Sequence, residues 1–132
     1  MIWGYRKHPP TNSPLALCID PVTDCSAIPR RANEILEFAP GVKIIARATA
    51  QVTQLSALQV GDLLFFDADT TESDAGRLDH VGMFMGQDTA GRYRFVSSRK
   101  THNGPTFGDE GGASVVDGSG FYARSLHAAR RL

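Results

Sequence analysis

Apolar and polar positions along the second half of the chain follow the short period that is typical of β-strands. The segment LQVGDLLFFDA predicts a turn at Gly61-Asp62 followed by a buried strand, and HVGMFMG and GRYRFVSS predict two further strands. GASVVDG is a fourth candidate strand, and FYARSLHAARRL is a candidate for the last one. Because alternate apolar residues of a strand usually face a core, we expect Val81, Met83 and Met85 to be buried.

The first half has a helical pattern. In DCSAIPRRANEILEF, Asp24 or Ser26 can cap a helix, Pro29 suits its first turn, and an apolar stripe follows. Pro40 and Gly41 predict its end. VKIIARATAQVTQL fits either a strand or a short helix, and residues 1–23, rich in proline, predict an irregular arm.

This order of elements, a helix and then an antiparallel meander, predicts one α+β domain over residues 1–132. We expect its helices to pack on one face of the sheet. A length of 132 residues and a hydrophobic fraction of 42% are ordinary for one domain with one modest core.

Composition excludes some partners. The 14 basic and 14 acidic residues cancel, so no long-range field favours nucleic acid or an anionic membrane. No apolar run reaches the roughly 20 residues of a membrane span, and the first residues carry no signal-peptide pattern. These features are compatible with a mature protein, with a protein that is cytosolic as synthesised, or with a part of a longer export precursor.

Two cysteines are the first candidates for chemistry. Cys25 stands at the predicted helix start, where the helix dipole favours a reactive thiolate, whereas Cys18 lies in an apolar stretch and reads as a small buried residue. The spacing does not fit a CxxC redox pair, and there is no second pair for structural zinc. A Cys18–Cys25 disulfide stays open, and it would remove the nucleophile.

A thiolate nucleophile needs a base that is held rigidly, and His80 at the head of a predicted strand fits that role. The other histidines lie in less suitable places: His8 in the proline-rich arm, His102 in a loop, and His127 beside the terminal AARRL. A histidine at a strand end is also common as a purely structural residue.

Read in order, DCS, LQVGDLLFF, DHVGMFMG, RFVSS and ARSLHAARRL resemble the NlpC-type cell-wall peptidase family, from Asp24 to Leu132. These are papain-like cysteine peptidases that cut peptidoglycan stem peptides, and the separation of Cys25 and His80 by 55 positions is close to the family pattern. The resemblance implies a papain-like fold, in which an N-terminal helix carries the cysteine and packs on an antiparallel sheet.

The resemblance also implies the site. Cys25 matches the nucleophile and His80 the general base, while Asp24 and Ser26 match the flanking residues that shape the oxyanion and substrate site. Ser97 stands where the family has the polar residue that orients the histidine, although serine is shorter and uncharged. The implied reaction is hydrolysis of an amide in the stem peptide, between D-glutamate and a diamino acid, and it needs no cofactor.

The long loop after Ser97 predicts a border of the substrate groove. We expect Ser98 and Arg99 to contact substrate, with Arg99 meeting stem-peptide carboxylates. Ser98 or a later loop residue can instead replace Ser97 as the orienting group. A metal site of His102, Asp109, Glu110 and Asp79 is the weaker alternative.

Other functions stay open beside the peptidase. One is a cell-wall-binding module of the same fold that has lost turnover, and another is an acyltransferase or thioesterase that uses the same cysteine and histidine. The resemblance predicts a protein of the cell wall, periplasm or exterior. A phage-tail or toxin context would keep the chemistry and add an immunity or tail protein as a partner.

Overall fold

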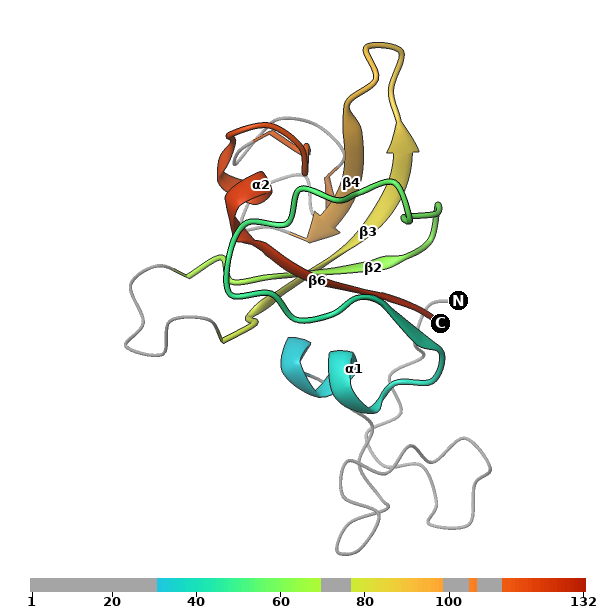
Figure 1. The fold of residues 1–132 in the computed structure, drawn as a ribbon, viewed down its shortest axis with the longest axis vertical. Coiled ribbons are helices and arrows are strands. Elements are labelled where there is room, and N and C mark those ends of the chain that lie inside the picture. The colour runs from blue at the N-terminus through green and yellow to red at the C-terminus, as the bar shows by residue number, and fades with distance from the viewer. Residues whose placement is uncertain (1–30, 70–76, 99–104, 107–112) are drawn as a thin grey trace, which may run out of the picture.

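The computed structural model describes residues 31–69, 77–98, 105–106 and 113–132. These residues form a mixed α+β fold with one antiparallel sheet (Figure 1). In chain order the elements are α1 (Ala32–Phe38), β1 (Val42–Ile45), β2 (Leu63–Phe66), β3 (His80–Gln87), β4 (Tyr93–Ser98), β5 (Pro105–Thr106), α2 (Phe121–Ser125) and β6 (Leu126–Arg131). The coarse prediction of an α+β domain is confirmed for this part of the chain.

The sheet has the strand order β1-β6-β2-β3-β4-β5. Strands β2, β3 and β4 form the predicted antiparallel meander, and each lies beside its neighbour in sequence. The last strand, β6, inserts between β1 and β2, so the end of the chain forms an interior strand next to the edge of the sheet. The ambiguous segment after Gly41 begins as a strand, β1, whose partner is β6.

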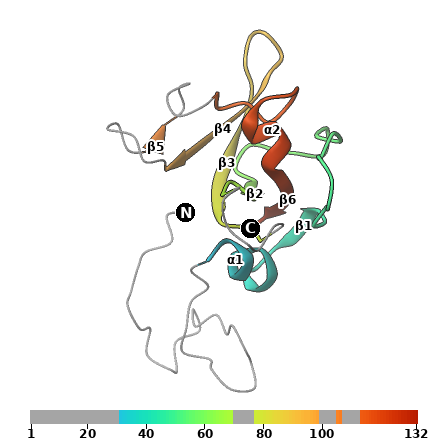
Figure 2. The same cartoon turned by 90° about the vertical axis from the view of Figure 1, so that its left-hand side faces the viewer.

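Two apolar clusters cover the two faces of the sheet. One contains the buried residues of α1, inward-facing residues of β2 and β6, and a leucine just before β3: Ala32, Leu36, Phe65, Leu78 and Ala128. The other lies under α2 and the segment between β1 and β2, and its members include Leu55, Leu58, Leu64, Phe66, Phe84, Phe95, Tyr122 and Leu126. Figures 1 and 2 show α1 and α2 with the strands between them. The expectation that the helices share one face is therefore wrong.

The first described helix starts later than predicted. Arg31 is extended, with φ −89° and ψ 151°, and α1 begins at the next residue. The carboxylate of Glu34 accepts a hydrogen bond from the backbone N–H of Arg31 at 3.1 Å, and this local cap fixes the start of the helix there. One continuous helix from Cys25 to Phe38 is thus excluded, and the cysteine does not stand at the start of α1.

The C-terminal end of α1 is held by Arg130 of β6. This buried guanidinium donates hydrogen bonds to the carbonyl oxygens of Leu36 at 2.7 Å, Pro40 at 3.1 Å and Gly41 at 3.2 Å, and also to that of Ala39. Carbonyls at the end of a helix have no partner within it, so a planar, five-donor side chain is well suited to this position. The contact attaches α1 to an interior strand of the sheet.

Three further expectations differ from the structure. Met83 is 36% exposed and Met85 is 41% exposed, because α1 is short and packs over β2, β6 and the first residues of β3 only. GASVVDG forms no strand, and it meets β4 through one isolated bridge between Val115 and Arg94. The final segment, predicted as one strand, divides into α2 and β6.

The predicted turn at Gly61-Asp62 is present and structural. The side chain of Asp62 is 1% exposed and accepts two hydrogen bonds from Arg131, each at 2.8 Å. The paired carboxylate raises the pKa of the Arg131 guanidinium above its ordinary value through that hydrogen bond, against the opposing effect of desolvation. Asp62 also accepts a hydrogen bond from the backbone N–H of Gln59 at 2.8 Å, which ties the turn to the segment before it. Within the described residues no helix is long and apolar enough to cross a membrane.

Candidate active site

His80 begins β3 and lies directly opposite Phe66 of β2. Its ring is half-buried and faces the cluster under α2, with ring centroids 5.9 Å from Phe66 and 6.0 Å from Tyr122. The Nε2 atom is among the buried atoms of the ring. Aromatic neighbours on two sides restrict the rotation of the imidazole, as a general base requires.

The residue before the histidine fixes the start of its strand. The carboxylate of Asp79 accepts hydrogen bonds from the backbone N–H groups of Ala68 at 2.9 Å and Asp69 at 2.7 Å. The backbone N–H of Asp79 donates to the carbonyl of Phe66 at 3.0 Å. Asp79 therefore ties the end of β2 to the beginning of β3, and it does so beside His80. Its carboxylate oxygens are engaged by the backbone rather than arranged around an ion.

Ser97 lies on the same face of the sheet as His80. It is 5% exposed and stands directly opposite Gly82, and Gly82 shares a face with His80 because the two are two residues apart on one strand. Diagonal neighbours of this kind have Cα atoms roughly 7–8 Å apart. The structure thus brings together the predicted base and the predicted orienting residue on adjacent strands.

Of the other predicted site residues, only Ser98 lies in the part of the chain that the structure describes. Ser98 follows Ser97 on the same strand, so its exposed side chain points to the opposite face, away from the ring of His80. Asp24, Cys25, Ser26 and Arg99 lie outside the described residues. The alternative metal ligands His102, Asp109 and Glu110 do so as well.

The helix α1 and the ring of His80 lie on opposite faces of the sheet. The helix packs with Val81, whereas the ring of His80 points to the other face of the sheet. At the same time the helix start and the histidine lie at the same end of β3. The side-chain oxygen of Asn33, in the first turn of α1, accepts a hydrogen bond from the backbone N–H of Leu78 at 3.2 Å.

Tyr122 was missed as a site residue, and Asp79 was named only as a candidate metal ligand. Tyr122 comes from α2, far along the chain, and nothing in FYARS distinguishes a ring that packs on His80 from an ordinary core residue. An acidic residue directly before the histidine was a usable signal for Asp79 as a strand-start clamp. His127 has a structural role, because its Nδ1 atom lies 2.7 Å from the carbonyl oxygen of Ala48.

No group of three or more metal-ligating side chains occurs in the part of the chain that the structure describes. No known protein family matches the sequence, and neither a curated protein nor a solved structure matches it.

Proposed function

We propose that the protein is a cysteine peptidase that hydrolyses an amide bond of peptidoglycan stem peptides, the bond between D-glutamate and a diamino acid. Cys25 is the nucleophile, His80 is the general base, and Ser97 orients the imidazole. The bond that is cleaved comes from the family resemblance. The arrangement of His80 and Ser97 on one face of β3 and β4 supports the base and its orienting residue.

The observation that carries the proposal is the hydrogen bond between Asn33 and Leu78. It holds the first turn of α1 against Leu78, which lies two residues before His80 in the sequence. The chain that leads back from α1 to Cys25 therefore departs from the end of the sheet where the histidine lies. Arg31 lies six positions after Cys25 in the sequence, and an extended chain of that length spans roughly 20 Å. Packed layers lie only about 10 Å apart, so a cysteine on this segment can reach the face that holds His80.

In the proposed reaction His80 accepts the thiol proton of Cys25, and the thiolate attacks the carbonyl carbon of the stem peptide. Backbone N–H groups around Asp24 and Ser26 stabilise the oxyanion, as the resemblance implies. The imidazolium then gives its proton to the departing amine, leaving a thioester. A water molecule, deprotonated by His80, hydrolyses the thioester and restores the free thiol.

The test is hydrolysis of a synthetic stem peptide that contains D-glutamate followed by a diamino acid. We expect release of the diamino-acid fragment by the unaltered protein, no release with Cys25→Ser or His80→Ala, and a rate reduced roughly 10- to 100-fold with Ser97→Ala. Cys18→Ser is the matched control and keeps full activity. Equal, slow cleavage by all of these proteins would contradict the proposal.

One observation favours a second candidate, a cell-wall-binding module without turnover. The described helix starts at Ala32 rather than at the cysteine, and it covers the face opposite the ring of His80. This candidate predicts retention of the protein on purified peptidoglycan sacculi, no cleavage of the stem peptide, and retention that is unchanged by Cys25→Ser.

A further inference from the structure

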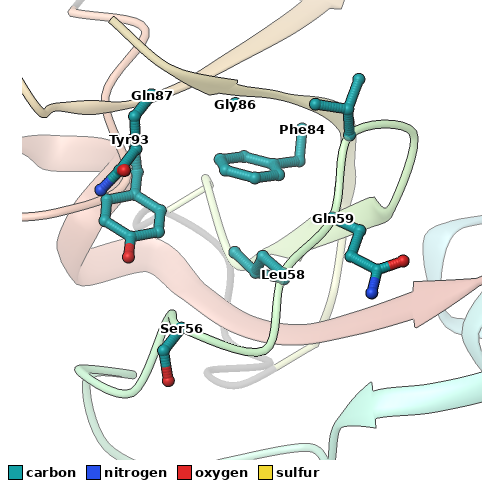
Figure 3. Close-up of a pocket in the computed structure, with 8 residues that line it drawn as sticks. Ser56, Leu58, Gln59, Phe84, Gly86, Gln87 and Tyr93 are labelled. Carbon is teal, nitrogen blue, oxygen red and sulfur yellow. The ribbon is translucent and has the colours of Figure 1, made fainter.

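A hollow of about 370 Å³ lies on the face of the sheet that also holds His80, toward the opposite end of β3 (Figure 3). Its apolar part comes from Leu58, Val60, Phe84 and Tyr93, and its polar part includes the side chains of Ser56 and Gln59. The volume is at the small end of the range for ligand sites, which fits one small ring. The hollow surrounds Gly86, six residues along β3 from His80, a separation on the order of 20 Å.

We infer that this hollow binds the pyranose ring of a neutral sugar. The lining contains no acidic or basic side chain, so it offers nothing to balance the charge of a carboxylate, a phosphate or an ammonium group. An entirely apolar ligand is also unsuitable, because it would cover the Ser56 hydroxyl and the Gln59 amide without giving them hydrogen bonds.

The polar groups match a ligand that carries hydroxyls on its rim. The Ser56 hydroxyl, the Gln59 side-chain amide and the Tyr93 hydroxyl make no hydrogen bond within the described residues, and together they supply both donors and acceptors. In Figure 3 the Tyr93 hydroxyl and the Ser56 hydroxyl lie to one side of the Phe84 ring, and Gln59 lies to the other. A pyranose presents hydroxyls around its edge and C–H groups on its faces, which suits polar groups around an apolar floor.

The aromatic part of the hollow is already stacked. Phe84 is 3% exposed and its ring lies 5.7 Å from that of Tyr93, with 24° between the planes. The half-buried Tyr93 ring thus supplies the apolar floor under a ligand, the buried Phe84 ring holds it in place, and the stacked pair leaves no slot between two rings for a nucleobase. A sugar ring needs only one apolar surface, so it fits this floor better than a flat base does.

The walls of the hollow are held in place before any ligand binds. The buried carboxylate of Asp62 accepts a hydrogen bond from the backbone N–H of Gln59, and Phe84 exchanges backbone hydrogen bonds with Gly61 at 2.9 Å and Asp62 at 2.8 Å. The register of β3 against β4 shifts between Phe84 and Gly86, and Gly86 has a φ of +100° that favours glycine. Such bulges bend a strand and re-aim its side chains, and a rigid site loses little entropy on binding.

An NMR titration of the ¹⁵N-labelled protein with N-acetylglucosamine trimer tests this inference. We expect saturable shifts at residues 56–60, 84–87 and 93, with affinity reduced roughly five- to tenfold by Gln59→Ala and by Tyr93→Phe. Gln54→Ala, an exposed glutamine outside the hollow, is the matched control and leaves the affinity unchanged.

The inference is overturned by an absence of saturable shifts, by shifts that do not map to the hollow, or by tighter binding of adenosine than of the trimer. The sugar site is independent of the proposed hydrolysis. His80→Ala should abolish cleavage of the stem peptide and leave the sugar titration as it is, so failure of either proposal can be distinguished from failure of the other.

Discussion

At the scale of single residues, Gly82 determines how closely β3 and β4 can approach around the candidate active site. A Cβ atom at this position would lie 2.6 Å from Cδ2 of Phe95 and 3.1 Å from the carbonyl oxygen of Val96. Phe95 is fully buried and its ring packs against Phe66 and Tyr122, both of which also contact His80. A side chain at Gly82 therefore disturbs the surroundings of the histidine.

We expect Gly82→Ala to lower the free energy of unfolding by about 1–3 kcal/mol, because the added methyl group over-packs a filled core. Urea denaturation followed by fluorescence or circular dichroism measures this change. Gly120→Ala is the matched control, since a Cβ atom there meets nothing within 4 Å, and its effect should stay below about 1 kcal/mol. Equal stabilities for the two variants would show that a methyl group at position 82 is accommodated without strain, which would contradict the close contacts described for Gly82.

Single residues were predictable where a local pattern specified them. The strand-start position of His80 and the role of the Gly61-Asp62 turn followed from the alternation of apolar residues and from turn chemistry. The exposure of Met83 and Met85 did not, because it depends on how far α1 extends over the sheet. Strand alternation specifies which side chains share a face, and tertiary packing decides whether that face is covered.

At the scale of elements, the attachment of α1 depends on Arg130. Its guanidinium donates hydrogen bonds to carbonyl groups at the end of the helix, among them those of Leu36 and Ala39. We expect Arg130→Met to lower the free energy of unfolding by roughly 2–4 kcal/mol, because several buried carbonyls lose a charged donor together. Arg130→Lys should recover only part of this loss, since an ammonium group cannot reproduce the planar fork.

The control for this prediction is Arg124→Met in α2. Arg124 is exposed and donates to the carbonyl of Ser119 at 2.8 Å, so its replacement should cost about 0.5 kcal/mol or less. Thermal or urea unfolding of both variants makes the comparison. If Arg130→Met is as stable as Arg124→Met, then α1 is held by its apolar contacts alone.

Elements were predicted well where strands adjacent in sequence also pair, as β2, β3 and β4 do. The insertion of β6 between β1 and β2 was not visible, because it joins segments from distant parts of the chain. The five-residue α2 is shorter than a reliable helical period, and its residues read equally well as a strand. The start of α1 was misplaced because Asp24 and Ser26 are good caps by residue type. The hydrogen bond that fixes the start of α1 instead runs from the backbone N–H of Arg31 to the carboxylate of Glu34.

At the scale of the whole molecule, one face of the sheet carries both candidate sites and the other carries α1. His80 lies at one end of β3 and the hollow around Gly86 at the other, on the same face of the sheet. The bidentate pair of Asp62 and Arg131 links the middle of the chain to its last strand beside the hollow. This placement makes the face that holds His80 and the hollow the functional face in our account.

The central claim is that Cys25 and His80 form a reactive pair, and the rate of alkylation by iodoacetamide against pH tests it most directly. The measurement uses reduced protein with Cys18→Ser, so that only Cys25 reacts, and compares it with His80→Ala and with His127→Ala as the matched histidine control. We predict an inflection well below the free-cysteine pKa of about 8.5, lost with His80→Ala and kept with His127→Ala. An ordinary thiol titration that is indifferent to His80 would contradict the account.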